Sequence, residues 1–181
     1  MKNLITLCLF YIFIFTDKNY KVDFGTNKDG KDWLVINDGV MGGLSQGDAQ
    51  LKENSILFKG TVSLDNNGGF SSLRSSFAAR DLSNYTQLTL RYRSTGVSKA
   101  ITLSISRRWY VPNYKKSLPD TNSEWKIITV NLKDFDKYYI GRKIRGELTK
   151  EILGKILRIG FITDEKKYGD FEFEVDYIGF K

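Results

Sequence analysis

Residues 171–177 have the sequence FEFEVDY, in which apolar and acidic side chains alternate. Successive side chains of a β-strand point to opposite faces of its sheet, so a period of two predicts a strand with one buried and one solvated face. We therefore expect Phe171, Phe173, Val175 and Tyr177 to point into a hydrophobic core.

The same period of two recurs along most of the chain beyond residue 20. Apolar side chains alternate at Ile56, Phe58, Val62 and Leu64, at Leu88, Leu90 and Tyr92, and at Ile101, Leu103 and Ile105. Further strands are expected at residues 33–36, 70–77, 125–132 and 157–163, with turn sequences between them. The single helical expectation is residues 149–155. This pattern predicts one all-β domain, an antiparallel β-sandwich of the jelly-roll type.

The composition excludes most familiar catalytic chemistry. The chain of 181 residues contains no histidine, and its one cysteine, Cys8, lies in the N-terminal segment. Without histidine there is no Ser-His or Cys-His pair and no imidazole ligand for a metal. No acidic loop has the regular oxygen spacing of a calcium site. We therefore expect no enzyme, no cofactor and no metal centre.

The first residues differ from the rest of the chain. Lys2 precedes an apolar run over residues 4–15, which is too short to span a membrane comfortably and is typical of a secretory signal. We expect residues 1–16 to be a signal peptide and residues 20–181 to form the β-sandwich domain of an exported protein, periplasmic or extracellular. An uncleaved membrane anchor is the alternative, because no clean cleavage site follows.

The charge balance is basic but evenly spread. The chain has 28 Lys and Arg against 21 Asp and Glu, a net charge of +7. The basic residues stand alone or in short pairs with acidic residues between most of them, whereas a nucleic-acid surface usually shows denser clusters. We expect no nucleic-acid partner, and we keep an anionic membrane surface open as a partner.

Two glycine-bearing segments stand out from this β pattern. Residues 38–45 read DGVMGGLS, and residues 66–74 read NNGGFSSLR. Paired glycines permit tight turns and a close approach of the backbone to a neighbour. Neither segment has the spacing of a phosphate-binding loop or of a dinucleotide fingerprint. The plain interpretation is two surface loops, and the functional one is a binding surface.

These two segments carry a family resemblance. They resemble the corresponding segments of the complex I intermediate-associated protein 30 family. The resemblance also includes Trp33, residues 58–65, Trp125, the LKDF of residues 132–135, and the IGFITD, GDF and VDYI sequences near the end of the chain. The similarity covers about residues 30 to 180. It implies a galactose-binding-like β-sandwich and a chaperone-like role in the assembly of respiratory complex I. The Ser-Thr-Gly at residues 94–96 departs from the Gly-Asp-Gly that is usual in the family.

Our leading hypothesis is a non-enzymatic β-sandwich that binds a protein partner near these two loops. We expect Asp38 to pair with Arg74 and so brace the first loop against the second. Met41 would offer an adaptable apolar contact, and Asn66 and Asn67 polar ones. The candidate binding residues are Asp38, Met41, Gly42, Gly43, Ser45, Asn66, Asn67, Arg74 and Trp109.

The alternative hypothesis is an exported carbohydrate-binding module. Flat aromatic rings stack on the apolar faces of sugars, and Trp109 and Tyr110, which follow Arg107 and Arg108, are the best candidates for an exposed platform. Trp33 and Trp125 stand at strand starts, where we expect core positions.

Overall fold

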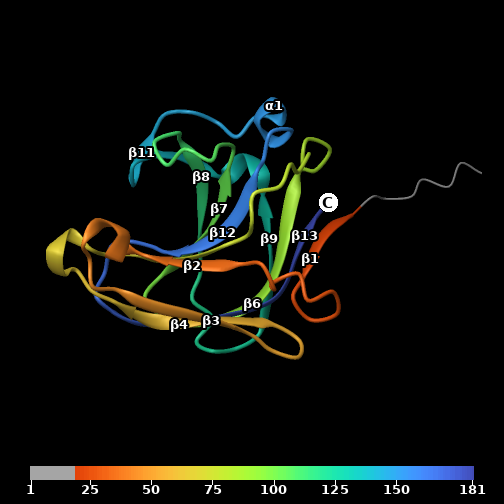
Figure 1. Ribbon diagram of the computed structural model, residues 1–181. Helices are drawn as coiled ribbons and strands as arrows, with labels where there is room; N and C mark the ends of the chain where they lie inside the picture. The colour runs from red at the N-terminus through yellow and green to blue at the C-terminus, as the bar shows by residue number, and fades with distance from the viewer. Residues whose placement is uncertain (1–18) are drawn as a thin grey trace, which may run out of the picture.

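Two antiparallel β-sheets pack face to face in the computed structural model, which describes residues 19–181 (Figure 1). Sheet A has the strand order β3 (Gln46–Leu51), β4 (Ile56–Val62), β13 (Gly169–Phe180), β6 (Gln87–Gly96) and β9 (Lys126–Asn131), and β1 (Tyr20–Asp23) also pairs with β13. Sheet B has the order β11 (Arg142–Ile144), β10 (Asp136–Tyr139), β8 (Asn113–Leu118), β7 (Lys99–Ser104), β12 (Arg158–Thr163), β5 (Ser71–Arg74) and β2 (Leu34–Asn37). The predicted antiparallel sandwich is confirmed.

The core lies between the inward faces of the two sheets. The alternating apolar side chains of β6, β13 and β12 meet there, and Phe161 of sheet B packs against Phe173 of sheet A with ring centroids 4.8 Å apart. Trp33 is buried beside the same cluster, where its ring stacks on that of Phe161. The period of two therefore identified the residues that hold the layers together.

One inward expectation is wrong, because β13 contains a bulge. The register against β6 shifts between Val175 and Tyr177, so the side chains beyond the shift exchange faces. Ile178 and Phe180 are buried, whereas Tyr177 is only partly buried and has the Lys21 ammonium 4.5 Å from its ring centroid. Phe171, Phe173 and Val175 are buried as predicted.

The expected helix is present but short. α1 spans Lys150–Leu153, and the Thr149 side chain at its N-cap accepts a hydrogen bond of 3.4 Å from the Ile152 backbone N–H. Three single-turn 3₁₀ segments, η1 (Asp38–Met41), η2 (Asp65–Asn67) and η3 (Leu132–Asp134), make up the other helical pieces of residues 19–181.

Several strand boundaries differ from the sequence expectation. The expected strand at residues 70–77 is only β5, and both Leu64 and Ile105 lie beyond the ends of their strands, with Leu64 exposed. Two polar strands were not expected, because they lack the alternation of apolar and polar residues: β3 has the sequence QGDAQL and β8 the sequence NYKKSL. Each gains its backbone hydrogen bonds from a neighbouring strand, so tertiary pairing outweighs a weak local signal.

No helix among residues 19–181 is long and apolar enough to cross a membrane. The signal peptide expected at residues 1–16 lies outside the described residues.

Candidate functional site

The buried carboxylate of Asp38 joins the two glycine-bearing loops. Its Oδ1 accepts a hydrogen bond of 2.9 Å from the Ser45 backbone N–H, and its Oδ2 accepts one of 2.5 Å from the Ser45 hydroxyl. From the second loop, Oδ2 accepts the backbone N–H groups of Gly69 at 2.6 Å and Phe70 at 3.2 Å. Asp38 is 1% exposed. One side chain thus fixes the backbone of both loops, as expected for the bracing of the first loop by the second.

The electrostatics of this carboxylate favour its charged form. Burial raises the pKa of Asp38, but the hydrogen bonds donated by the Ser45 hydroxyl and by the N–H groups of Gly69, Phe70 and Ser45 outweigh burial, and the pKa lies below its usual value. Asp38 is therefore a structural anion without access to solvent.

The expected ion pair between Asp38 and Arg74 is absent. Arg74 lies on β5 and donates its Nε to the Ser72 hydroxyl at 2.8 Å. Backbone N–H groups take the place of the guanidinium, because Gly69 and Phe70 lie closer to the carboxylate. Arg74 belongs to another surface, the outer face of sheet B.

Gly43 gives Asp38 the space it occupies. A Cβ added at Gly43 would lie 2.4 Å from the Asp38 Cγ, which no side chain could tolerate without displacing the carboxylate. The preceding Gly42 has φ of +88° and ends η1 in the left-handed conformation. The glycine pair therefore serves backbone shape and close approach.

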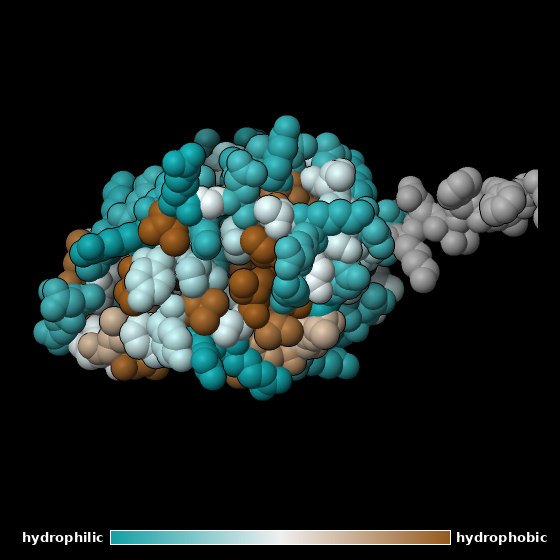
Figure 2. Space-filling model, turned by 90° about the horizontal axis from the view of Figure 1, so that it is seen from above, coloured by the Kyte–Doolittle hydropathy of each residue, from teal (hydrophilic) through white to brown (hydrophobic). Residues whose placement is uncertain are grey.

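Apolar side chains on this braced structure point into solvent. Val40 is 75% exposed, Met41 72% and Leu44 55%. Leu64, also exposed, lies nearby because the Ser63 backbone N–H donates to the Ser45 hydroxyl oxygen at 3.0 Å. We call Val40, Met41, Leu44 and Leu64 the apolar platform. It lies at the end of the molecule on the left of Figure 1, and the same end in Figure 2 shows hydrophobic groups among hydrophilic ones.

Asn66 and Asn67 shape the second loop. Both are exposed, and both have positive φ, 53° and 60°, in the left-handed region that asparagine tolerates better than most residues. Neither contributes a hydrogen bond to the Asp38 network. They lie at the edge of the candidate surface as turn residues.

The structure separates Trp109 from this site. Trp109 follows β7, is 78% exposed and makes an edge contact with the Tyr110 ring at 5.9 Å. The core position expected for Trp125 is wrong, since this ring lies on the outer face of sheet A beneath the guanidinium groups of Arg91 and Arg93. Two exposed tryptophans therefore mark two surfaces away from the loops.

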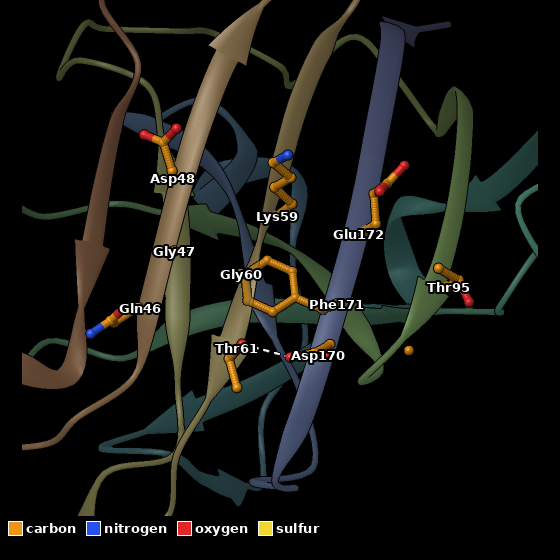
Figure 3. A pocket seen from close by; sticks show the side chains of 11 residues that line it. Gln46, Gly47, Asp48, Lys59, Gly60, Thr61, Thr95, Asp170, Phe171 and Glu172 are labelled. Carbon is orange, nitrogen blue, oxygen red and sulfur yellow. Dashed lines mark hydrogen bonds between the residues drawn. The ribbon is translucent and has the colours of Figure 1, made fainter.

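An open trough of about 740 Å³ crosses the outer face of sheet A (Figure 3). The Thr61 hydroxyl donates to the Asp170 carboxylate at 2.6 Å within it, and its charged side chains are mainly acidic. It is lined by Gln46, Gly47, Asp48, Lys59, Gly60, Thr61, Thr95, Gly96, Asp170, Phe171 and Glu172. Sequence reasoning missed the trough because its residues come from four strands, and only their outward positions in each alternating row could have indicated it.

Chemically, the braced loops offer shape and apolar contact. Among residues 19–181 no group of three metal-ligating side chains gathers. The Asp38 carboxylate is saturated by donors and lies below the surface, so the exposed groups of this site are the apolar platform, the two asparagines and Asp65 at the start of η2.

The sequence model of the family described as complex I intermediate-associated protein 30 matches residues 22–175. The chain belongs to this family. The match includes both glycine-bearing loops, so the resemblance inferred from them is confirmed. None of the curated proteins compared with the chain matches it.

Solved structures support the fold that this family assignment implies. A family 11 carbohydrate-binding module from Clostridium thermocellum, in complex with a β-1,3-1,4-mixed-linked tetrasaccharide, has 19% identity and a TM-score of 0.61 over 90% of this chain and 94% of that one. The same module of the cellulase Lic26A-Cel5E has 18% identity and a TM-score of 0.62, covering 90% and 93%. An agarase shares the fold at 12% identity and a TM-score of 0.60, over 90% of this chain and 24% of its own. At these identities the likeness concerns the fold alone.

Proposed function

We propose that this member of the complex I intermediate-associated protein 30 family is a non-enzymatic assembly factor that binds a protein partner through the apolar platform. The observation that carries the proposal is the exposure of Val40, Met41 and Leu44 on a loop whose backbone is held by the buried Asp38. Exposed apolar side chains on a rigid support lose little conformational entropy on binding, so their burial contributes more fully to affinity. The family description supports a protein partner, an assembly intermediate of a larger complex.

The test is site-specific photo-crosslinking followed by identification of the captured protein. A photoreactive residue at position 40 should capture a defined partner, and one at Tyr139, an exposed aromatic residue on β10 towards the opposite edge of sheet B, should not. Met41→Ser should abolish capture without changing the melting temperature. Leu34→Ser provides the control, because Leu34 is exposed to a similar extent, 62%, but lies on β2. Equal loss in both variants, or full capture by Met41→Ser, would refute the proposal.

The compartment in which the protein meets its partner depends on the N-terminal segment. We propose that residues 1–16 direct export, as their charged and then apolar sequence indicates. Intact-mass measurement of protein recovered from the periplasm or medium should give a chain that begins near residues 16–19. Full-length protein confined to the cytoplasm would contradict this.

A second candidate function is carbohydrate binding through Trp109 and Tyr110. Trp109 is the most exposed aromatic ring among residues 19–181, and its edge contact with Tyr110 leaves a flat face open. The fold shared with carbohydrate-binding modules supports this candidate. On a glycan array, Trp109→Ala should lose binding, whereas Trp125→Ala, which removes an exposed ring from sheet A, should retain it. Absence of any glycan signal for the unmodified protein would exclude this second function.

A further inference from the structure

Arginine side chains gather on the outer face of sheet B. Leu73 of β5 and Ile159 and Phe161 of β12 are fully buried, so Arg74 and Arg158, at the alternate positions, point away from the core. Arg74 pairs in register with Gly160, and a Cβ at Gly160 would lie 3.2 Å from the Arg74 Cγ. The Arg74 side chain therefore lies across the glycine, on the side that Arg158 also faces.

The partly buried ring of Phe77 makes cation–π contacts with the guanidinium groups of Arg158 and Arg107. The Arg158 Cζ lies 3.4 Å from the centroid of the Phe77 ring, and the Arg107 Cζ lies 5.1 Å from it. The charges are close enough to oppose one another. Burial and then the charge of Arg158 lower the pKa of Arg74, while burial and then the charges of Arg107 and Arg80 lower that of Arg158. Mutual repulsion of this kind is relieved when an anion binds between the cations.

The cluster lacks anionic partners in the described part of the chain. Within residues 19–181 no carboxylate lies within 4.0 Å of a guanidinium nitrogen of Arg74, Arg107 or Arg158, and the Nε of Arg158 is buried without a hydrogen-bond partner. Two other arginines have acceptors: Arg93 pairs with Glu174 at 2.6 Å, and Arg80 donates to the Leu157 carbonyl at 2.8 Å. The Arg158 Nε itself has no surface open to a ligand, so an anion is bound through the terminal nitrogens of this partly buried side chain, which have no acceptor among residues 19–181.

We propose that Arg74, Arg107 and Arg158 bind the carboxylate or sulfate groups of an acidic polysaccharide. The guanidinium fork donates two parallel hydrogen bonds to such an oxyanion. A glycan fits better than an acidic peptide because Trp109, two residues beyond Arg107, presents an open ring for a sugar, and the floor between the arginines consists of small residues, among them Gly160 and Thr102. The proposal rests on the second candidate function and adds the class of glycan.

The experiment measures the binding of matched polymers to the full chain by calorimetry. Dextran sulfate and neutral dextran differ only in the sulfate, and polygalacturonate presents carboxylates, so the three polymers identify which oxyanion is bound. Poly-glutamate presents the same carboxylate on a peptide. The variants are Arg158→Gln and Arg74→Gln, and Arg158→Lys retains the charge without the fork. The double variant Arg142→Gln with Arg145→Gln is the control, because it removes charge from exposed arginines at or beside β11, at the opposite edge of sheet B.

We expect dextran sulfate, polygalacturonate or both to bind, and neutral dextran to bind more weakly. Loss of one charged hydrogen bond weakens binding by roughly tenfold to a hundredfold, which we expect for Arg158→Gln, Arg158→Lys and Arg74→Gln at unchanged melting temperature. The control should change affinity less than threefold.

Equal losses in the control, or full binding by Arg158→Lys, would show general attraction to a basic surface and overturn the site. Poly-glutamate binding with the same arginine dependence would overturn the assignment to a glycan. If Trp109→Ala abolishes neutral-glycan binding while the arginine variants bind acidic glycans normally, the second candidate function survives and this inference fails.

Discussion

The Asp38 carboxylate accepts a 2.6 Å hydrogen bond from the backbone N–H of Gly69, a residue 31 positions further along the chain. With the bonds from Ser45 and Phe70, this contact makes a single anion the junction of two loops that carry the exposed platform. A charged acceptor in a buried position strengthens each bond and makes its loss expensive.

Replacement of Asp38 by alanine should therefore lower stability sharply. It leaves the N–H groups of Ser45, Gly69 and Phe70 without their acceptor, at a cost on the order of 3 kcal/mol. Urea unfolding measures the change. Asp48→Ala, which removes an exposed carboxylate from β3, should change stability by less than about 0.5 kcal/mol. Equal midpoints for the two variants would refute the role assigned to Asp38.

Acid should weaken the same junction. Because the folded pKa of Asp38 lies below its unfolded value of about 3.9, its stabilisation is complete above that pH and is lost as pH falls through the lower, folded pKa. Asp38→Asn should therefore be less stable than the unmodified chain at pH 6, and the difference should shrink towards pH 2. Urea midpoints at both pH values test this, and a constant difference would contradict it.

Neighbouring glycines of the first loop should differ in their tolerance of a methyl group. Gly43→Ala forces a Cβ to within 2.5 Å of the Asp38 carboxylate and should cost about 1–3 kcal/mol. A Cβ at Gly39 meets nothing within 4 Å, so Gly39→Ala is the matched control and should be neutral within about 0.5 kcal/mol. Thermal unfolding of both variants decides, and a neutral Gly43→Ala would show that these glycines form plain turns.

Lys99 should make the protein more stable in mild alkali. Burial lowers the pKa of Lys99 to about 8, although the charges of Asp120 and Glu172 act in the opposite direction, and its ammonium donates to the Thr95 carbonyl at 2.5 Å. The unfolded pKa is about 10.4, so the unfolded chain binds more protons between these values and stability rises with pH there.

Lys99→Met removes the buried charge and should raise stability at pH 7 by about 1–3 kcal/mol. It should also flatten the rise in stability between pH 8 and 9.5. Lys126→Met, at an exposed position of β9, should leave both unchanged. A lower stability of Lys99→Met at pH 7 would mean that the bond to Thr95 outweighs the cost of burial.

The sequence predicted those parts of the fold that depend on alternation within a strand. Alternation with polar neighbours predicts core positions for Phe173 and Leu90, and both side chains are fully buried. The same alternation predicts an inward Tyr177, which is wrong because a bulge depends on how two strands pair, and local sequence does not show this.

The candidate site also has features that the sequence predicts and features that it does not. That the two glycine-bearing loops brace each other was predictable from their unusual sequences, but the identity of the bond was not. The sequence suggests a guanidinium as the partner of the Asp38 carboxylate. Its actual partners include backbone N–H groups, which every residue except proline has, so no residue type in the sequence indicates them. The arginine cluster comes from β5, β12 and the segment after β7, and only the sheet order brings these together.

The place of β13 in sheet A has a consequence for the time course of folding. This strand lies between β4 and β6 and also pairs with β1, yet it is built from residues 169–180, after every other strand in the described chain. During synthesis the β3–β4 pair and the β6–β9 pair therefore have unpaired edges until residues 169–180 emerge from the ribosome and join them. Such late, long-range pairing is slow and exposes strand edges to aggregation. Removal of residues 169–180 should therefore yield insoluble chains and no smaller sandwich.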